Sequence, residues 1–259
     1  MAFNKILTKL SEGDKILPYF ELGLLSESWP DHYNIKVDSR PYYGKGDGYF
    51  HPSTHSLMGA RQLYFRMHPG FRDTMIHKPF TLDQQMIFAT GSALHAVVQT
   101  QMQMVGLVKS EDDIELEYIL KEQHVRGRND FRVTHPDGNE YLVEMKTMDP
   151  WLYKNLKEPK IEWDAQLSMA EYAYGHTGGI ILVMERGGAC HMREFKHRRN
   201  DFLLEQIFEK FAYVRQCIKD NEPPRHCCAL DSDEMKSCPA RFQCWLREED
   251  DGRLHPQVD

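Results

Sequence analysis

The chain has 259 residues, with 32 Lys or Arg against 39 Asp or Glu, so its formal net charge is −7. A hydrophobic content of 41% excludes a disordered chain, and the negative charge excludes a protein that coats nucleic acid by bulk attraction. The sequence has neither a run of about 20 apolar residues, as a membrane span needs, nor the apolar centre of a signal peptide. We therefore expect a cytoplasmic protein with no membrane partner.

The first part of the chain, residues 1–80, is predicted to combine helix and loop. Turn-forming Gly, Pro and Tyr residues between 40 and 52 indicate a loop. Ser53 or Thr54 is a suitable cap for a helix that continues to Met67. A longer helix is expected to begin at Thr81 or Asp83 and to end near Gly106.

The middle of the chain alternates apolar and polar residues, as strands do. Residues 136–139, Pro-Asp-Gly-Asn, predict a tight turn between two of these strands. The expected strands are 115–123, 127–135, 140–148, 179–188 and 191–199. Helices are expected at 163–174 and 200–219, the second with Phe202, Ile207, Phe211 and Val214 on its inner side.

Two carboxylates and an amine are predicted to meet on the hairpin. Glu144 and Lys146 are two residues apart on one strand, so they share a face, and Asp130 on the neighbouring strand can reach it. Carboxylates suit a hard cation such as Mg²⁺ or Mn²⁺, which polarises a phosphate and acidifies water. The alternative is a solvated sheet face with cross-strand ion pairs.

Two further residues favour the metal site. His95 lies within an otherwise apolar helical stretch and offers an imidazole ligand or phosphate contact, although a lone helical His is more often a core residue. Gln166 lies on the helix that follows the Glu-Lys strand, where it can cover the site or remain an exposed amide.

Taken in order, GSALH, GRND, VEMKT and AQLSMAEY resemble the RecB-like branch of the PD-(D/E)XK nucleases, which includes CRISPR-associated and phage exonucleases. The resemblance runs from Pro52 to Trp245. It implies that His95, Asp130 and Glu144 bind Mg²⁺ or Mn²⁺, that Lys146 is catalytic and that Gln166 organises the site. Tyr172 fits the family's helix with a spacing that is two residues longer.

Cysteines near the C-terminus form the second candidate metal site. Cys227 or Cys228, with Cys238 and Cys244, suggest zinc or an iron–sulfur cluster, and buried thiols are the alternative. The resemblance implies a 4Fe–4S cluster held by three C-terminal cysteines and one N-terminal cysteine, but the first cysteine here is Cys190. The fourth ligand is the second of the Cys227–Cys228 pair, His226, Cys217 or Cys190, or it is absent, and Zn²⁺ is the rival metal.

Basic residues are clustered, which allows an acidic protein to hold DNA locally. Arg126 and Arg128 flank Asp130, and Arg61 and Tyr64 retain the pattern of the family's N-terminal helix. With Tyr172, these residues are the predicted nucleic-acid contacts. For any one of them, a solvated surface residue is the plainer interpretation.

The expected fold is α/β, with a PD-(D/E)XK restriction-endonuclease-like core, a mixed central sheet flanked by helices, and helical additions at both ends. We expect a single nuclease domain over 1–259, with a helix-and-loop region at 1–80, the core at 81–200 and the C-terminal helix and cysteines at 201–259. The predicted function is a metal-dependent deoxyribonuclease, an exonuclease acting on DNA ends or single strands in a bacterial or phage-infected cell, in DNA repair or recombination. The alternatives are a nucleic-acid-binding or assembly module with a vestigial nuclease core, and an RNA-directed nuclease; the oligomeric state stays open.

Overall fold

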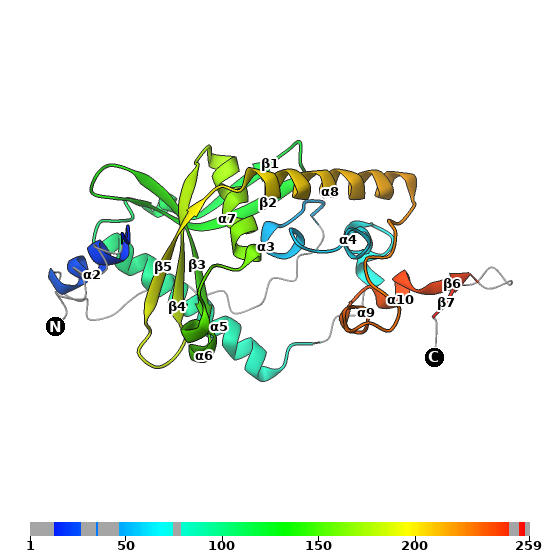
Figure 1. Ribbon diagram of the computed structural model, residues 1–259, viewed down its shortest axis with the longest axis horizontal. Helices are drawn as coiled ribbons and strands as arrows, with labels where there is room; N and C mark the ends of the chain where they lie inside the picture. The colour runs from blue at the N-terminus through cyan, green and yellow to red at the C-terminus, as the bar shows by residue number, and fades with distance from the viewer. Residues whose placement is uncertain (1–12, 27–34, 36–46, 75–78, 249–253, 257–259) are drawn as a thin grey trace. The chain divides into compact units, whose positions relative to one another are not determined.

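The computed structural model describes residues 13–26, 35, 47–74, 79–248 and 254–256 (Figure 1). The chain divides into two units. The first comprises residues 1–42, 80–119 and 126–201, and the second comprises residues 43–79, 120–125 and 202–259. No helix among the described residues is long and apolar enough to cross a membrane.

Five strands form one mixed sheet in chain order, which confirms the predicted α/β class. β2 and β3 are antiparallel, β3 and β4 are parallel, and β4 and β5 are antiparallel. The parallel connection passes through two helices, as a crossover requires. The strands are β1 (Ile114–Leu120), β2 (Val125–Thr134), β3 (Glu140–Met148), β4 (Gly178–Glu185) and β5 (Met192–Arg198), and the crossover helices are α6 (Pro150–Asn155) and α7 (Ile161–Tyr174).

The predicted turn between β2 and β3 is confirmed. Gly138 has a φ of 88°, a conformation in which a side chain is strained, and the Asp137 carboxylate accepts a hydrogen bond from the Asn139 backbone at 2.9 Å. This turn sets the register in which Thr134 faces Glu140 and Phe131 faces Val143.

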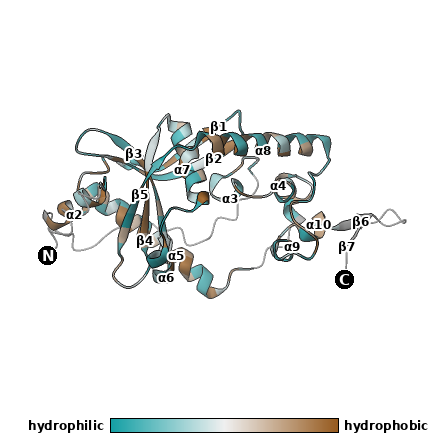
Figure 2. Ribbon diagram, in the orientation of Figure 1, coloured by the Kyte–Doolittle hydropathy of each residue, from teal (hydrophilic) through white to brown (hydrophobic). Residues whose placement is uncertain are grey.

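Helices cover both faces of the sheet. On one face, α5 (Leu82–Met104) contributes Val98 and Met102 to a core with Met145 of β3 and Leu182 of β4. On the other face lies α7, whose Leu167 approaches Gly179 of β4. β4 is buried over six successive residues, because both of its faces are covered (Figure 2).

The first unit also anchors a helix from early in the chain. The Glu194 side chain of β5 accepts hydrogen bonds from the backbone N–H groups of Lys15, Ile16 and Leu17, the last two at 2.8 and 2.9 Å. These donors lie at the start of α2 (Leu17–Ser26), where a helix leaves N–H groups without partners. The carboxylate satisfies them from about 178 residues away.

The second unit corrects two predictions. The helix expected from residue 53 or 54 to Met67 is broken at Ser56–Gly59, because Gly59 takes an extended conformation and begins α4. Phe202 is 71% exposed, whereas Ile207, Phe211 and Val214 are buried as predicted. The elements of this unit are α3 (Pro52–His55), α4 (Ala60–Met67), the 3₁₀ turn η1 (Arg72–Thr74), α8 (Asp201–Asp220), α9 (Asp233–Ser237), α10 (Arg241–Cys244), β6 (Leu246–Glu248) and β7 (Leu254–Pro256).

Candidate functional site

A fork between β2 and β3 forms the base of the candidate site. Regular pairing stops at Phe131 and Val143, and side chains continue it: the Asp130 carboxylate accepts a hydrogen bond from the Met145 N–H at 2.6 Å, and the Asn129 amide donates to the Val143 carbonyl at 3.2 Å. Asp130 is therefore held rigidly between two strands. Its second carboxylate oxygen is left for other partners.

Glu144 and Lys146 lie on the same face of β3, as predicted. The Lys146 ammonium is 2.5 Å from Glu144 Oε1 and donates to Gln166 Oε1 of α7 at 3.0 Å. Glu144 is 1% exposed, and its Oε2 has no hydrogen-bond partner among the described residues. Burial, together with the charge of Asp130, raises the pKa of Glu144 to about 7. A buried carboxylate oxygen without a partner is costly unless a cation or proton meets it.

His95 approaches the fork from α5. Its Nδ1 is 3.7 Å from Asp130 Oδ1. Burial alone would lower the pKa of His95, but the negative charge of the neighbouring Asp130 outweighs burial and raises it. Gly91, one turn earlier, lets α5 pack closely on β3, because a Cβ there would meet Thr147 Oγ1 at 3.2 Å. The fork thus joins groups from helices on opposite faces of the sheet.

Contacts or charge interactions link all five residues predicted for the centre of the site, which are His95, Asp130, Glu144, Lys146 and Gln166. Across the residues that the structure describes, no three His, Cys, Asp or Glu side chains are arranged to hold a metal ion as they stand. The donor types nevertheless suit a hard cation, because two carboxylates and an imidazole belong to the site and Glu144 Oε2 is buried without a hydrogen-bond partner among the described residues.

Glu115 and Gln99 belong to the same site and were not predicted. The Gln99 amide donates to Glu115 Oε1 at 3.1 Å and to the Asp130 carbonyl at 3.0 Å. Glu115, with a φ of 54°, also lies 2.5 Å from Arg128 Nε. Burial and the neighbouring Asp130 raise the pKa of Glu115, opposed by the Gln99 hydrogen bond and by Arg128. Gln99 could have been assigned to the site from the sequence, because it lies one helical turn after His95 in the predicted helix.

A cleft of about 920 Å³ opens beside these residues. His95 and Asp130 line it together with Arg128, whereas Glu144 is buried and is not among its lining residues. The cleft is therefore large enough to bring a polymer segment to the carboxylate fork.

A buried charge network lies on the α7 side of the sheet. His197 of β5 contacts Asp164 at 2.6 Å and Glu171 at 3.0 Å, and Asn200 also donates to Asp164. Burial opposes the charged imidazole, but these two carboxylates raise the pKa of His197 to about 9. Ser168 completes the network with a hydroxyl that accepts from the Asn200 N–H at 3.0 Å. Because His197 is 7% exposed and Ser168 is buried, the network has a structural role.

The predicted nucleic-acid contacts divide by exposure. Tyr64 is 1% exposed, so the prediction that it contacts DNA is wrong. Arg61 donates to Cys244 Sγ at 3.0 Å and to the carbonyls of Pro224 and Cys244, which ties the C-terminal segment to α4. Three predicted contacts remain on the surface, namely Arg126, Arg128 and Tyr172.

The cysteine-rich segment folds against the start of α4. A Cβ built on Gly59 would lie 2.9 Å from Cys227 Sγ, so only glycine fits there. Cys244 is buried, and its Sγ lies 3.5 Å from His226 Nδ1. Burial and the nearby thiols of Cys227 and Cys238 raise the pKa of Cys228. The four thiols thus lie in one neighbourhood.

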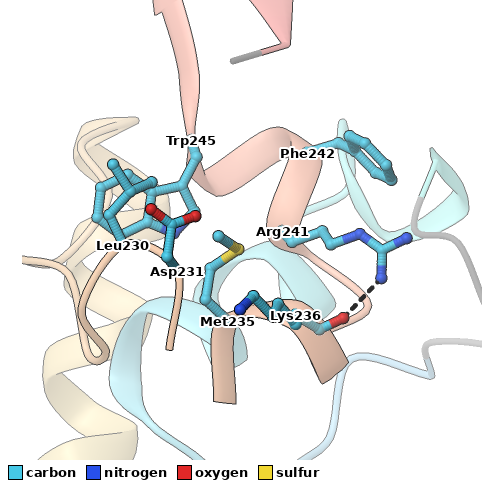
Figure 3. A pocket seen from close by; sticks show the side chains of 7 residues that line it. All are labelled: Leu230, Asp231, Met235, Lys236, Arg241, Phe242 and Trp245. Carbon is cyan, nitrogen blue, oxygen red and sulfur yellow. Dashed lines mark hydrogen bonds between the residues drawn. The ribbon is translucent and has the colours of Figure 1, made fainter. Parts of the chain in front are cut away.

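The same segment encloses a separate pocket of about 340 Å³ (Figure 3). Arg241 donates to the Lys236 carbonyl at 2.8 Å across one side of it. The pocket residues are interspersed along the chain with the C-terminal cysteines. They are Leu230, Asp231, Met235, Lys236, Arg241, Phe242 and Trp245.

Comparison with known proteins identifies the architecture of the first unit's sheet. No family model and no curated protein matches the sequence. The alkaline exonuclease LHK-Exo in complex with dAMP superimposes with a TM-score of 0.51 at 16% identity, over 67% of this chain and 89% of that chain. The fold is that of the PD-(D/E)XK nucleases.

Two more solved structures are similar at lower scores. A second structure of the alkaline exonuclease LHK-Exo, from Laribacter hongkongensis, has a TM-score of 0.45 at 14% identity, over 67% of this chain and 89% of that chain. The protein SSO0001 has a TM-score of 0.44 at 15% identity, over 76% of this chain and 86% of that chain. At such identities, the PD-(D/E)XK likeness describes the fold, and function must be argued from the site.

Proposed function

We propose that this chain is a metal-dependent DNA nuclease, an exonuclease that hydrolyses phosphodiester bonds at DNA ends or in single strands. One observation carries the proposal: Glu144 is buried, is contacted by Lys146 on one oxygen, and has no partner for the other within the described part of the chain. The alternative, a solvated sheet face with cross-strand ion pairs, does not fit Glu144, which is 1% exposed. The PD-(D/E)XK fold and the resemblance of the LHK-Exo complex with dAMP support the same class.

The ligands of Mg²⁺ or Mn²⁺ would be Asp130, Glu144 and His95. The ion would polarise the phosphate and lower the pKa of the water that it binds. Asp130 contributes a fixed carboxylate, because the Met145 N–H orients it. Lys146, positioned by Gln166, donates a hydrogen bond towards the attacking water or the developing negative charge. Asp130 also limits the mobility of His95, since their side chains lie 3.7 Å apart.

The test is cleavage of end-labelled DNA by the purified chain with Mn²⁺ or Mg²⁺. Glu144→Gln and Lys146→Met should each lose cleavage while keeping the circular dichroism spectrum of the wild type. Retained cleavage in both variants would reject the site. DNA binding without any cleavage by the wild type would favour the binding module, and preferential cleavage of a matched RNA strand would favour the RNA-directed nuclease.

We further propose that Cys227, Cys228, Cys238 and Cys244 hold a soft metal, either a 4Fe–4S cluster or Zn²⁺. The support is their common neighbourhood and the approach of Cys227 to Gly59 at the start of α4, the region from which the family's N-terminal cysteine comes. Anaerobic purification followed by an absorption spectrum and metal analysis distinguishes the two. A metal-free, colourless protein with unchanged stability in chelator would reject both.

A further inference from the structure

The cleft beside Asp130 extends along most of α5. Its lining includes Ile87 at one end of the helix and Gln103 at the other, with His95 midway. Sixteen helical steps of about 1.5 Å separate Ile87 from Gln103, so the cleft follows α5 for about 24 Å. It is therefore long enough for several nucleotides of an extended strand.

The two ends of this cleft differ in chemistry. At one end, Ile87 and Phe88 are 42% and 43% exposed, and Arg186 adds a positive charge. Arg186 lies at this end because its backbone N–H donates to Met148, next to Thr147, which in turn faces Gly91. The exposed aromatic ring of Phe88 suits stacking with a base, Ile87 adds an apolar surface beside it, and the cation suits a phosphate.

The opposite end is acidic. Glu111 and Glu115 line it, and Gln99 ties Glu115 to the Asp130 strand. Arg128 is the cation here, but it already lies 2.5 Å from Glu115. This end therefore offers no net attraction to a phosphate backbone, and Glu111 repels one.

We propose that the cleft binds one unpaired DNA strand, with its bases against Ile87 and Phe88 and its backbone at Arg186, and that the strand ends near Asp130 because Glu111 and Glu115 repel phosphates beyond it. The inference rests on the proposed nuclease function and specifies its substrate. The bases inside a duplex are already paired and stacked on one another, so they have no open faces for Phe88, and only the terminal pair does. Phe88 is thus the residue that selects unpaired strands.

Binding can be measured without cleavage, in chelator, by fluorescence anisotropy of a labelled ten-nucleotide thymidine strand and of a blunt hairpin duplex. Phe88→Ala should weaken binding of the strand about tenfold, within the range for loss of one base stack, and should leave the hairpin affected less than about twofold. Met86→Ala is the matched control, because Met86 is 58% exposed on the same helix and lies outside the cleft lining. Melting temperatures establish that both variants fold.

Two outcomes overturn the proposal: a loss in Phe88→Ala no larger than in Met86→Ala, or equal losses for strand and hairpin. Glu111→Gln tests the acidic end of the cleft. A closed single-stranded circle has no end and must pass Glu111, so this substitution should improve binding of the circle relative to binding of the linear strand. An unchanged ratio of the two affinities would contradict the proposal that Glu111 repels the strand. Because no cleavage is required, an inactive wild-type protein would reject the nuclease function while leaving the binding result to decide the inference.

Discussion

The Asp130 carboxylate accepts a hydrogen bond from the Met145 backbone N–H at 2.6 Å, at the point where β2 and β3 stop pairing. One carboxylate oxygen thus accepts the hydrogen bond that a strand carbonyl would otherwise accept, and the other lies 3.7 Å from His95 Nδ1. Asp130 is thus predicted to have two roles, completing the strand pairing and binding a metal ion, and substitutions can test them separately.

Asp130→Asn should separate them. The amide oxygen still accepts from Met145, so the free energy of unfolding should change by less than about 1 kcal/mol, whereas Asp130→Ala leaves that buried N–H unpaired at a cost of about 1–3 kcal/mol. Both variants should lose at least about a hundredfold in Mn²⁺-dependent cleavage, since even partners outside the ligand shell contribute about 10- to 100-fold. Urea unfolding and rate assays measure the two effects. Equal destabilisation by both substitutions would contradict the structural role.

Metal affinity should rise with pH. Glu144 has a pKa of about 7 without metal, because it is buried and lies near Asp130, so a proton competes with the cation below that pH. Mn²⁺ binding by calorimetry should therefore strengthen about tenfold from pH 6 to 8. His95 also titrates with a raised pKa, so the comparison is made in a His95→Asn background, with and without Glu144→Gln. A pH dependence that survives Glu144→Gln in that background would exclude Glu144 as its source.

The folded protein should lose stability as the solution becomes alkaline. Folding raises the pKa of His197 from 6.5 to about 9, through Asp164 and Glu171, so the charged imidazole contributes fully below pH 6.5 and its contribution disappears as pH rises through 9. The loss is about 3 kcal/mol. Urea unfolding between pH 6 and 9 should show this slope in the wild type and a much flatter one in His197→Gln. Parallel curves for the two proteins would contradict it.

Two neighbouring glycines of β4 should respond differently to the same added methyl group. A Cβ on Gly179 would lie 2.6 Å from the Leu142 carbonyl and 2.8 Å from Glu171 Oε1, whereas a Cβ on Gly178 meets only the His197 carbonyl at 3.4 Å. Gly179→Ala should cost more than about 2 kcal/mol of unfolding free energy, and Gly178→Ala less than about 1 kcal/mol. Chemical denaturation of both variants checks this, and similar values would refute the close packing of α7 on β4.

Strong local signals made much of the fold predictable. The Pro-Asp-Gly-Asn turn fixed the hairpin, the alternation of residues 140–148 fixed β3, and Thr81 capped α5 with its side chain as expected. The same alternation predicted that Glu144 and Lys146 share one face of β3. The order of the sequence motifs along the chain added His95 and Gln166 to the predicted site.

Residues whose roles depend on distant partners were not predictable in this way. Phe202 is apolar but exposed, and Tyr64 is polar-tipped but buried, because tertiary packing rather than residue type decides which side of a helix is covered. The partners of His197 are partly visible in the sequence, since Asp164, Ser168 and Glu171 recur at helical spacing along α7. The sequence does not show that these polar residues contact β5, because β5 begins 18 residues after α7 ends.

The attachment of α2 to Glu194 has a consequence for biosynthesis. The residues that need this carboxylate, Lys15 to Leu17, leave the ribosome long before β5 is made. Their N–H groups must stay solvated, or find temporary partners, until almost three-quarters of the chain has been translated. α2 can thus dock on Glu194 only after β5 has been made, and truncation before residue 194 would leave it without its anchor.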